Sequence, residues 1–238
     1  MATTLLLVRH GENNWVKERR LAGWLPGVRL NERGHEQAAA LGKRLATLPL
    51  QAVYSSPLER CLETANYIAS PHQLTIIPLE AVGEVHYGEW EGAALKELAQ
   101  KPEWQAVQFS PSRFQFPGGE SLRAVQARAV DALEQMARDH PKQMIVVVSH
   151  ADVIKLALAH YLGMHLDLFQ RIGLATAAVS VIVLGARGAQ VVRVNDDGPL
   201  QPPAEPEKEA EDNQAVPATE AISGEAEPEA GTSANQAE

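Results

Sequence analysis

Short apolar runs alternate along the chain with longer segments of helical periodicity, and this alternation restricts the fold more than any other feature. Residues 3–8 (TTLLLV) and 144–148 (MIVVV) are typical of buried strands. Residues 31–48 and 121–140 instead repeat apolar side chains every three or four positions, as amphipathic helices do. The pattern predicts an α/β protein, a three-layer sandwich with a mostly parallel central sheet flanked by helices.

The same criteria assign the remaining elements. Further strands are expected at residues 52–54 and 74–77, and further helices at 57–69, where Pro57 suits a first turn, and at 151–162. Two closing strands are expected at 177–184 and 190–194. They either form a sheet edge or pair between subunits, so a monomer and a homodimer both remain open.

Charge divides the chain at residue 198. The whole sequence carries 21 Lys plus Arg and 30 Asp plus Glu, a net charge of −9. Residues 198–238 hold ten of the acidic residues and one lysine, which leaves 20 of each sign for residues 1–197. We therefore expect one folded domain over 1–197 and a disordered tail over 198–238, because the tail has six prolines and no aromatic residue.

Charge, hydropathy and cysteine content each exclude a class of protein. The neutral charge of residues 1–197 disfavours a nucleic-acid binder. No apolar run approaches the roughly 20 residues of a membrane span. The first eight residues lack the basic start of a secretory signal, and the single cysteine, Cys61, cannot form an internal disulfide or a cysteine metal cluster. A cytoplasmic protein is the expectation.

Polar residues follow three of the predicted strands. Arg9 and His10 come after the first strand, Arg60 lies one turn into the helix after the second, and His150 follows residues 144–148. Ligands of such sheets bind beyond the carboxyl ends of the strands. Two histidines and two arginines are thus predicted to meet at one sheet edge.

These residue types point to phosphate chemistry. Guanidinium groups match phosphate oxygens and stay charged, and a histidine among fixed cations can attack through its unprotonated nitrogen. A proton donor for the leaving group is expected within residues 84–92 (EVHYGEWEG). No acid-rich metal cage accompanies them, so no metal is expected.

Five collinear motifs make the chain resemble the histidine phosphatase superfamily, the phosphoglycerate mutase-like proteins. The motifs are LLLVRHGE at 5–12, SSPLER with Thr64-Ala65 at 55–65, the acid-bearing segment 84–92, FPGGES at 116–121 and VVVSH at 146–150. The resemblance implies that His10 becomes a phosphohistidine while Arg9, Arg60 and His150 hold the phosphoryl oxygens. It implies that Glu84 protonates the leaving oxygen and then activates water.

Neighbours of Glu84 compete for its role. Glu89 and Glu91 lie beside Trp90 and Gly92, which suggests a structural role, and His86 is expected to line the pocket. These expectations leave Glu84 as the preferred acid.

One position departs from the family pattern. Many relatives carry an asparagine after the tryptophan of the first motif, where it touches the phosphoryl group, and this chain has Val16 there. Asn13 and Asn14 are the candidate substitutes, and Asn14 is assigned to phosphate binding.

The resemblance leaves three functions open. A phosphatase acting on a small phosphorylated metabolite is preferred, because the mutases carry a basic insertion before the second histidine and residues 84–150 contain no adjacent arginine pair. The alternatives are a mutase, which alone would need a 2,3-bisphosphoglycerate primer as cofactor, and an inactive binding protein. Lys17, Arg19 and Arg20 are either solvated or select a substrate with a second negative group. Arg113 is either a loop cation or caps the pocket.

Overall fold

The computed structural model describes residues 2–198, so the predicted acidic tail lies outside the described residues apart from Gly198. Six strands form one sheet in the order β3-β2-β4-β1-β5-β6. Neighbours are parallel from β3 to β1, while β5 runs antiparallel to β1 and β6 antiparallel to β5. The strands are β1 (Ala2–Arg9), β2 (Leu50–Ser55), β3 (Ile76–Pro78), β4 (Met144–Ser149), β5 (Val179–Gly185) and β6 (Gly188–Asp196).

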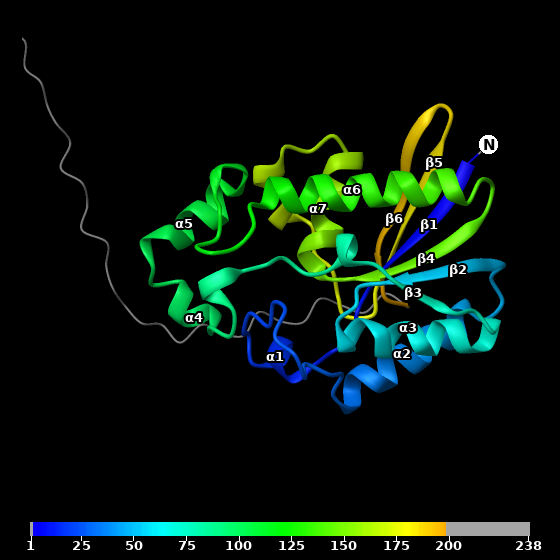
Figure 1. Cartoon of the computed structure of the whole chain (residues 1–238), viewed down its shortest axis with the longest axis horizontal. Coiled ribbons are helices and arrows are strands. Elements are labelled where there is room, and N and C mark those ends of the chain that lie inside the picture. The colour runs from blue at the N-terminus through cyan, green and yellow to red at the C-terminus, as the bar shows by residue number, and fades with distance from the viewer. Residues whose placement is uncertain (1, 199–238) are drawn as a thin grey trace, which may run out of the picture. The chain divides into compact units, whose positions relative to one another are not determined.

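Helices cover both faces of this sheet, with α2 and α3 on one side and α6 and α7 on the other (Figure 1). The predicted α/β sandwich is therefore confirmed. No helix within residues 2–198 is both long and apolar enough to cross a membrane. The α-helices are α1 (Asn14–Lys17), α2 (Glu32–Leu45), α3 (Glu59–Ala69), α4 (Leu95–Leu98), α5 (Pro102–Phe109), α6 (Leu122–Asp139) and α7 (Ala151–Tyr161).

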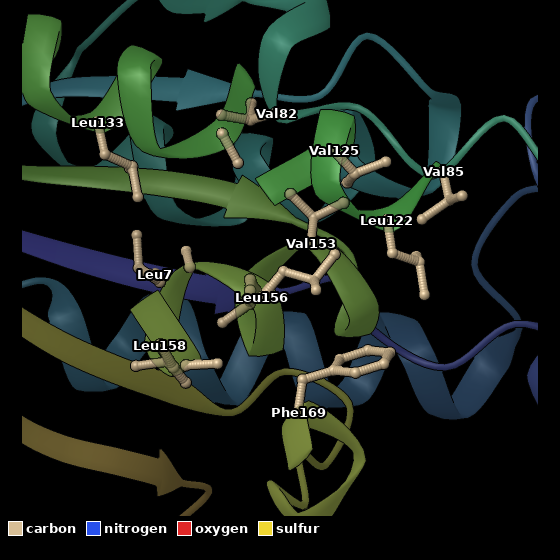
Figure 2. Close-up of a cluster of buried hydrophobic side chains, with 14 of the residues drawn as sticks. Leu7, Val82, Val85, Leu122, Val125, Leu133, Val153, Leu156, Leu158 and Phe169 are labelled. Atoms are coloured by element: carbon tan, nitrogen blue, oxygen red, sulfur yellow. The ribbon is translucent and has the colours of Figure 1, made fainter. Parts of the chain in front are cut away.

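Alternate residues of the central strands supply two separate cores, because successive side chains of a strand point to opposite faces. Leu5 and Leu7 of β1 belong to the core beneath α6 and α7, part of which Figure 2 shows. Leu6 and Val8 belong to the core beneath α2 and α3. Burial on both faces explains the unbroken apolar runs LLLV in β1 and MIVVV in β4.

Side-chain caps set the starts of two helices. The Asn31 side chain accepts a hydrogen bond from the Gly34 amide at the start of α2, and the Ser121 hydroxyl accepts one from the Ala124 amide at the start of α6. Each cap satisfies a backbone donor that has no partner inside its helix. Both helices begin one residue after the residue at which the sequence placed them.

The other boundaries differ by small amounts. Pro57 lies outside α3, which begins two residues later, and β3 is displaced toward the carboxyl end, to residues 76–78. The first closing strand is shifted to 179–185, the second lengthens to 188–196, and β6 forms the edge of the sheet. The sequence predicted no bounds for α4 and α5, which lie with α1 at the end of the molecule where β1 finishes (Figure 1).

Candidate active site

The two histidines meet because they follow adjacent parallel strands. Arg9 at the end of β1 pairs in register with Ser149 at the end of β4, so the residue after each strand emerges at the same edge. The amide of His10 donates to the Ser149 carbonyl over 3.0 Å. The rings of His10 and His150 lie edge to face with centroids 5.3 Å apart.

The hydrogen bond of His10 fixes which ring nitrogen is free. Its Nδ1 lies 2.7 Å from the Gly11 carbonyl oxygen. A carbonyl only accepts, so Nδ1 carries the proton and Nε2 keeps its lone pair. Burial, and then the charges of Arg60 and Arg9, hold the pKa of His10 well below its usual value. The ring is therefore neutral, and Nε2 can act as a nucleophile.

Backbone carbonyls orient the two arginines. Arg9 donates from Nη1 to the Leu174 carbonyl over 2.6 Å. Arg60 is only 1% exposed; it donates from Nη2 to the Gly23 carbonyl over 2.9 Å, and this nitrogen also lies 3.3 Å from Nδ1 of His150. One edge of each guanidinium is thus used in holding the side chain in place.

Three buried donors have no hydrogen-bond partner within residues 2–198. They are Nε of Arg9, Nη1 of Arg60 and Nδ2 of Asn13. All three side chains line one cavity of about 230 Å³ beside His10. Leaving a buried donor unpaired costs about 1–3 kcal/mol, more for a charged group. The cavity therefore favours an anion whose oxygens accept from these donors.

Glu84 faces the same cavity from the segment after β3. Its Oε1 accepts from the Val85 amide over 3.0 Å, and its Oε2 lies 3.5 Å from Nδ1 of His150 and 4.0 Å from Nη2 of Arg60. Burial raises the pKa of this carboxyl to about 7, and Asp152 adds to the rise while Arg60 opposes it. A carboxyl poised near neutrality can both donate and accept a proton.

His150 is fully buried at the start of α7. Its Nε2 lies 2.8 Å from the Ser56 hydroxyl and 3.4 Å from Sγ of Cys61. Burial and the neighbouring Arg60 charge keep the pKa of His150 well below its usual value, so this ring is also neutral. The structure thus brings together five of the predicted residues: Arg9, His10, Arg60, Glu84 and His150.

The asparagines differ from the prediction. Asn14, assigned to phosphate binding, is exposed on α1, and its side-chain oxygen meets Asn31 at 3.5 Å. Asn13 is 1% exposed and lines the cavity together with Val16. The reason is local: Asn13 caps α1 by accepting from the Val16 amide, which aims its Nδ2 inward.

Several other candidates lie outside the cavity lining. His86, expected to line it, is exposed and stacks on Trp24 with ring centroids 4.4 Å apart. Glu89 and Arg113 are exposed, so neither the rival acid nor the pocket cap is part of this lining. Glu91 accepts from the Trp24 amide over 3.3 Å, a structural contact.

Of the basic residues that follow His10, some line the cavity and one does not. Arg19 and Arg20 line the cavity, whereas Lys17 is exposed and does not. Arg20 donates to the Gly92 carbonyl and lies over the Trp15 ring, 4.7 Å from its centroid. These contacts hold Arg20 in the cavity lining, where Arg19 adds a second cation.

Two titratable residues of the cavity lining, Tyr87 and Asp152, were not assigned to the site from the sequence. Asp152 lies in the first turn of α7, and its Oδ2 accepts from the Tyr87 hydroxyl over 3.2 Å. Both were detectable in principle, because Tyr87 lies in the acid-bearing segment and Asp152 follows the second histidine by two residues. Within residues 2–198 no group of three or more His, Cys, Asp or Glu side chains is arranged to hold a metal ion.

Comparison with known proteins agrees with the family resemblance. The family model described as histidine phosphatase superfamily (branch 1) matches residues 5–197. Phosphoserine phosphatase 1 of Hydrogenobacter thermophilus is 35% identical over 193 residues, which are 80% of this chain and 91% of that protein. A metal-independent phosphoserine phosphatase of Arabidopsis thaliana is 38% identical over 159 residues, 64% of this chain and 66% of the relative.

A solved structure has the same fold. Bacillus stearothermophilus YhfR superposes with a TM-score of 0.77 at 31% identity, covering 82% of this chain and 97% of that one. The family model spans nearly all of the described residues. Four of the five motifs supply the residues that come together at one sheet edge: Arg9, His10, Arg60, Glu84 and His150. The chain therefore belongs to the histidine phosphatase superfamily, branch 1.

Proposed function

We propose that this protein is a phosphatase that hydrolyses small phosphomonoesters through a phosphohistidine on His10. The observation that carries the proposal is the set of three unpartnered buried donors, on Arg9, Arg60 and Asn13, around a neutral His10 with a free Nε2. A phosphoryl group supplies the acceptor oxygens that these donors lack.

The reaction has two steps. Nε2 of His10 attacks phosphorus, the bond from phosphorus to the leaving oxygen breaks, and protonated Glu84 gives its proton to that oxygen. Water then attacks the phosphohistidine, ionised Glu84 takes a proton from the water, and the N–P bond breaks to release inorganic phosphate. Arg9, Arg60 and His150 stabilise the phosphoryl charge in both steps. The scheme needs no metal or cofactor.

The substitution His10→Ala tests the proposal. It should abolish release of phosphate from p-nitrophenyl phosphate and prevent acid-labile labelling of the protein by a radioactive phosphate donor. Unchanged turnover in His10→Ala would exclude a phosphohistidine on His10, and with it both the phosphatase and the mutase mechanisms that depend on this residue. Tight phosphate binding without turnover in the wild type would favour the inactive binding protein.

For the substrate we infer a zwitterionic leaving group, with phosphoserine as the first candidate. Arg19 and Arg20 offer cations for a carboxylate, and Asp152 offers a carboxylate for an ammonium group. Two similar proteins are named phosphoserine phosphatases. Asp152→Asn should lower kcat/KM for phosphoserine about 10-fold while leaving 2-phosphoglycolate, which has no ammonium group, nearly unchanged. Equal losses on both substrates would contradict the assignment.

A phosphoglycerate mutase is the second candidate, because Arg19 and Arg20 in the cavity also suit a substrate with two anionic groups. Incubation with 3-phosphoglycerate, with and without a 2,3-bisphosphoglycerate primer, separates the two. We expect free phosphate and little 2-phosphoglycerate. Rapid interconversion with little free phosphate would establish the mutase instead.

A further inference from the structure

The Glu84 carboxyl group is attached to a segment that belongs to no helix or strand. Residues 83–87 lie between two short 3-10 turns. The side-chain contacts of Glu84 across the cavity are long, 3.5 Å to His150 and 4.0 Å to Arg60, and its one short bond is to the adjacent Val85 amide. The position of the carboxyl group therefore depends on what holds the backbone.

A single arginine of α6 holds that backbone on one side. Arg128 donates from Nη1 to the carbonyls of Ala81 and Gly83, over 2.8 and 2.9 Å, and from Nη2 to the carbonyl of Glu84 over 2.9 Å. Three carbonyls within four residues thus converge on one rigid planar group. A guanidinium suits this task because its donors have a fixed geometry.

Glu120 orients the guanidinium and holds the segment beyond Glu84. Its Oε1 and Oε2 accept from Nε and Nη2 of Arg128 over 2.9 and 3.0 Å, a bidentate pair. Oε2 also accepts from the His86 amide over 3.0 Å, and the Glu120 amide donates to the His86 carbonyl over 2.8 Å. The pair therefore anchors the chain both before and after the acid.

Trp24 connects this anchor to the phosphoryl-binding side. Its Nε1 donates to the Glu84 carbonyl over 2.7 Å, and the carbonyl of the preceding residue, Gly23, accepts from Arg60. The acid and a phosphoryl-binding arginine are thus tied to adjacent residues of one loop.

We infer that Arg128 and Glu120 are positioning residues that place the Glu84 carboxyl at the leaving oxygen. The inference rests on the proposed function, in which Glu84 is the proton donor. Neither side chain lines the cavity, and their contacts to the acid-bearing segment are with the backbone of residues 81–86. Besides burial, the Arg128 charge also helps to lower the pKa of His150. A change at His150 should affect all phosphate esters alike, whereas displacement of Glu84 should affect most the esters whose leaving group needs a proton. A displacement of about 1 Å in such a group costs about 100-fold in rate.

The test compares two esters of similar shape, phenyl phosphate and p-nitrophenyl phosphate. Phenolate needs a proton on leaving, while nitrophenolate is stable enough to leave without one. The ratio kcat/KM reports only the steps through leaving-group departure.

Arg128→Gln should lower kcat/KM about 10- to 100-fold for phenyl phosphate and at most about 3-fold for p-nitrophenyl phosphate. Arg138→Gln, the same change on an exposed arginine of the same helix, should alter neither.

Two further variants make the outcome decisive. Glu120→Gln should give the same selective loss, and the double variant should be little worse than Arg128→Gln alone, because the two residues act as one unit. If Arg128→Gln and Glu120→Gln lose activity equally on both esters, the positioning role is overturned and a purely structural role remains. Glu84→Gln is the reference: if it shows the selective loss and Arg128→Gln does not, only the positioning inference fails. If Glu84→Gln loses activity equally on both esters, the acid role itself fails.

Discussion

The side chain of Asn13 serves structure with one atom and the cavity with another. Its Oδ1 accepts from the Val16 amide to cap α1, and its buried Nδ2 has no partner within the described residues. The same cap that fixes the short helix thus leaves a buried donor in the cavity that Val16 also lines.

Replacing Asn13 with Asp separates these two uses. The cap acceptor stays, while the donor becomes a carboxylate oxygen that repels the phosphoryl group. We expect kcat/KM for p-nitrophenyl phosphate to fall at least about 10-fold with little change in Tm, since a hydrogen bond to a charged group contributes about 1.5–3 kcal/mol. Asn14→Asp adds the same charge one residue along on the exposed side and should cost far less. Similar losses in both variants would return phosphate binding to Asn14.

Glu84 should set the upper pH limit of the first step. Its pKa of about 7 lies above the ordinary value because burial disfavours the ionised form. The proton donor is the protonated form, so kcat/KM for phenyl phosphate should fall as the pH rises through about 7. The neutral His10 should impose no acid limit until the pH falls well below 6.5, because its pKa is lowered.

Glu84→Gln provides the control for that pH profile. The variant should lose the decline above pH 7 together with most of its activity toward phenyl phosphate. A decline that persists unchanged in Glu84→Gln would assign this limit to another group.

The site residues differ in how far the sequence could predict them. Arg9, His10 and His150 follow strong strand patterns, so topology alone brings them together. The inward turn of Asn13 depends on a cap in a four-residue helix, and the contacts of Arg128 depend on how α6 packs against residues 81–84. Neither arrangement has a periodic signal in the sequence.

At the scale of elements, the loop after β1 and the start of α2 pack backbone against backbone. A Cβ on Gly11 would lie 2.6 Å from the Gly34 carbonyl oxygen, and a Cβ on Gly34 would collide with the Glu12 carbonyl. The Gly34 amide also donates to the Asn31 cap. The helix therefore supports the loop that carries the nucleophile.

Gly34→Ala tests this support. Alanine is favoured over glycine in a helix by about 1 kcal/mol, yet here the collision with a fixed carbonyl should reverse the sign and destabilise the protein by about 2 kcal/mol. Urea unfolding gives the measurement. Gly173→Ala, outside any helix, is the control for adding a methyl group without a collision, because a Cβ there meets nothing within 4 Å. A Gly34→Ala variant more stable than the wild type would show that the loop after β1 moves at little cost to make room for the methyl group.

Element prediction succeeded where the pattern was long and regular. The helix at 122–139 and the strand at 144–149 match their expected ranges within one residue at each end. The sequence assigned no bounds to α4 and α5, because they are short helices of four and eight residues with little helical periodicity to detect.

At the scale of the whole molecule, filling the cavity should stabilise the fold. A ligand that binds only the native state adds about 2.7 kcal/mol at 100 times its Kd. For a domain of this size, inorganic phosphate should then raise Tm by about 5–10 °C relative to potassium chloride of equal ionic strength. Arg60→Ala should remove the shift, and treatment with EDTA should leave both the shift and the activity unchanged. A shift that survives in Arg60→Ala would place the phosphate elsewhere.

The register of β1 on β4 determines how the catalytic centre can vary. His10 and His150 lie one residue beyond paired positions of adjacent strands, so their separation follows from the spacing of backbone hydrogen bonds in a parallel sheet. Side-chain substitutions around the cavity leave that spacing untouched. Substrate preference can therefore change through substitutions on α1, in the loop after it and on α7. The distance between the two histidines stays the same, because backbone pairing of β1 with β4 sets it.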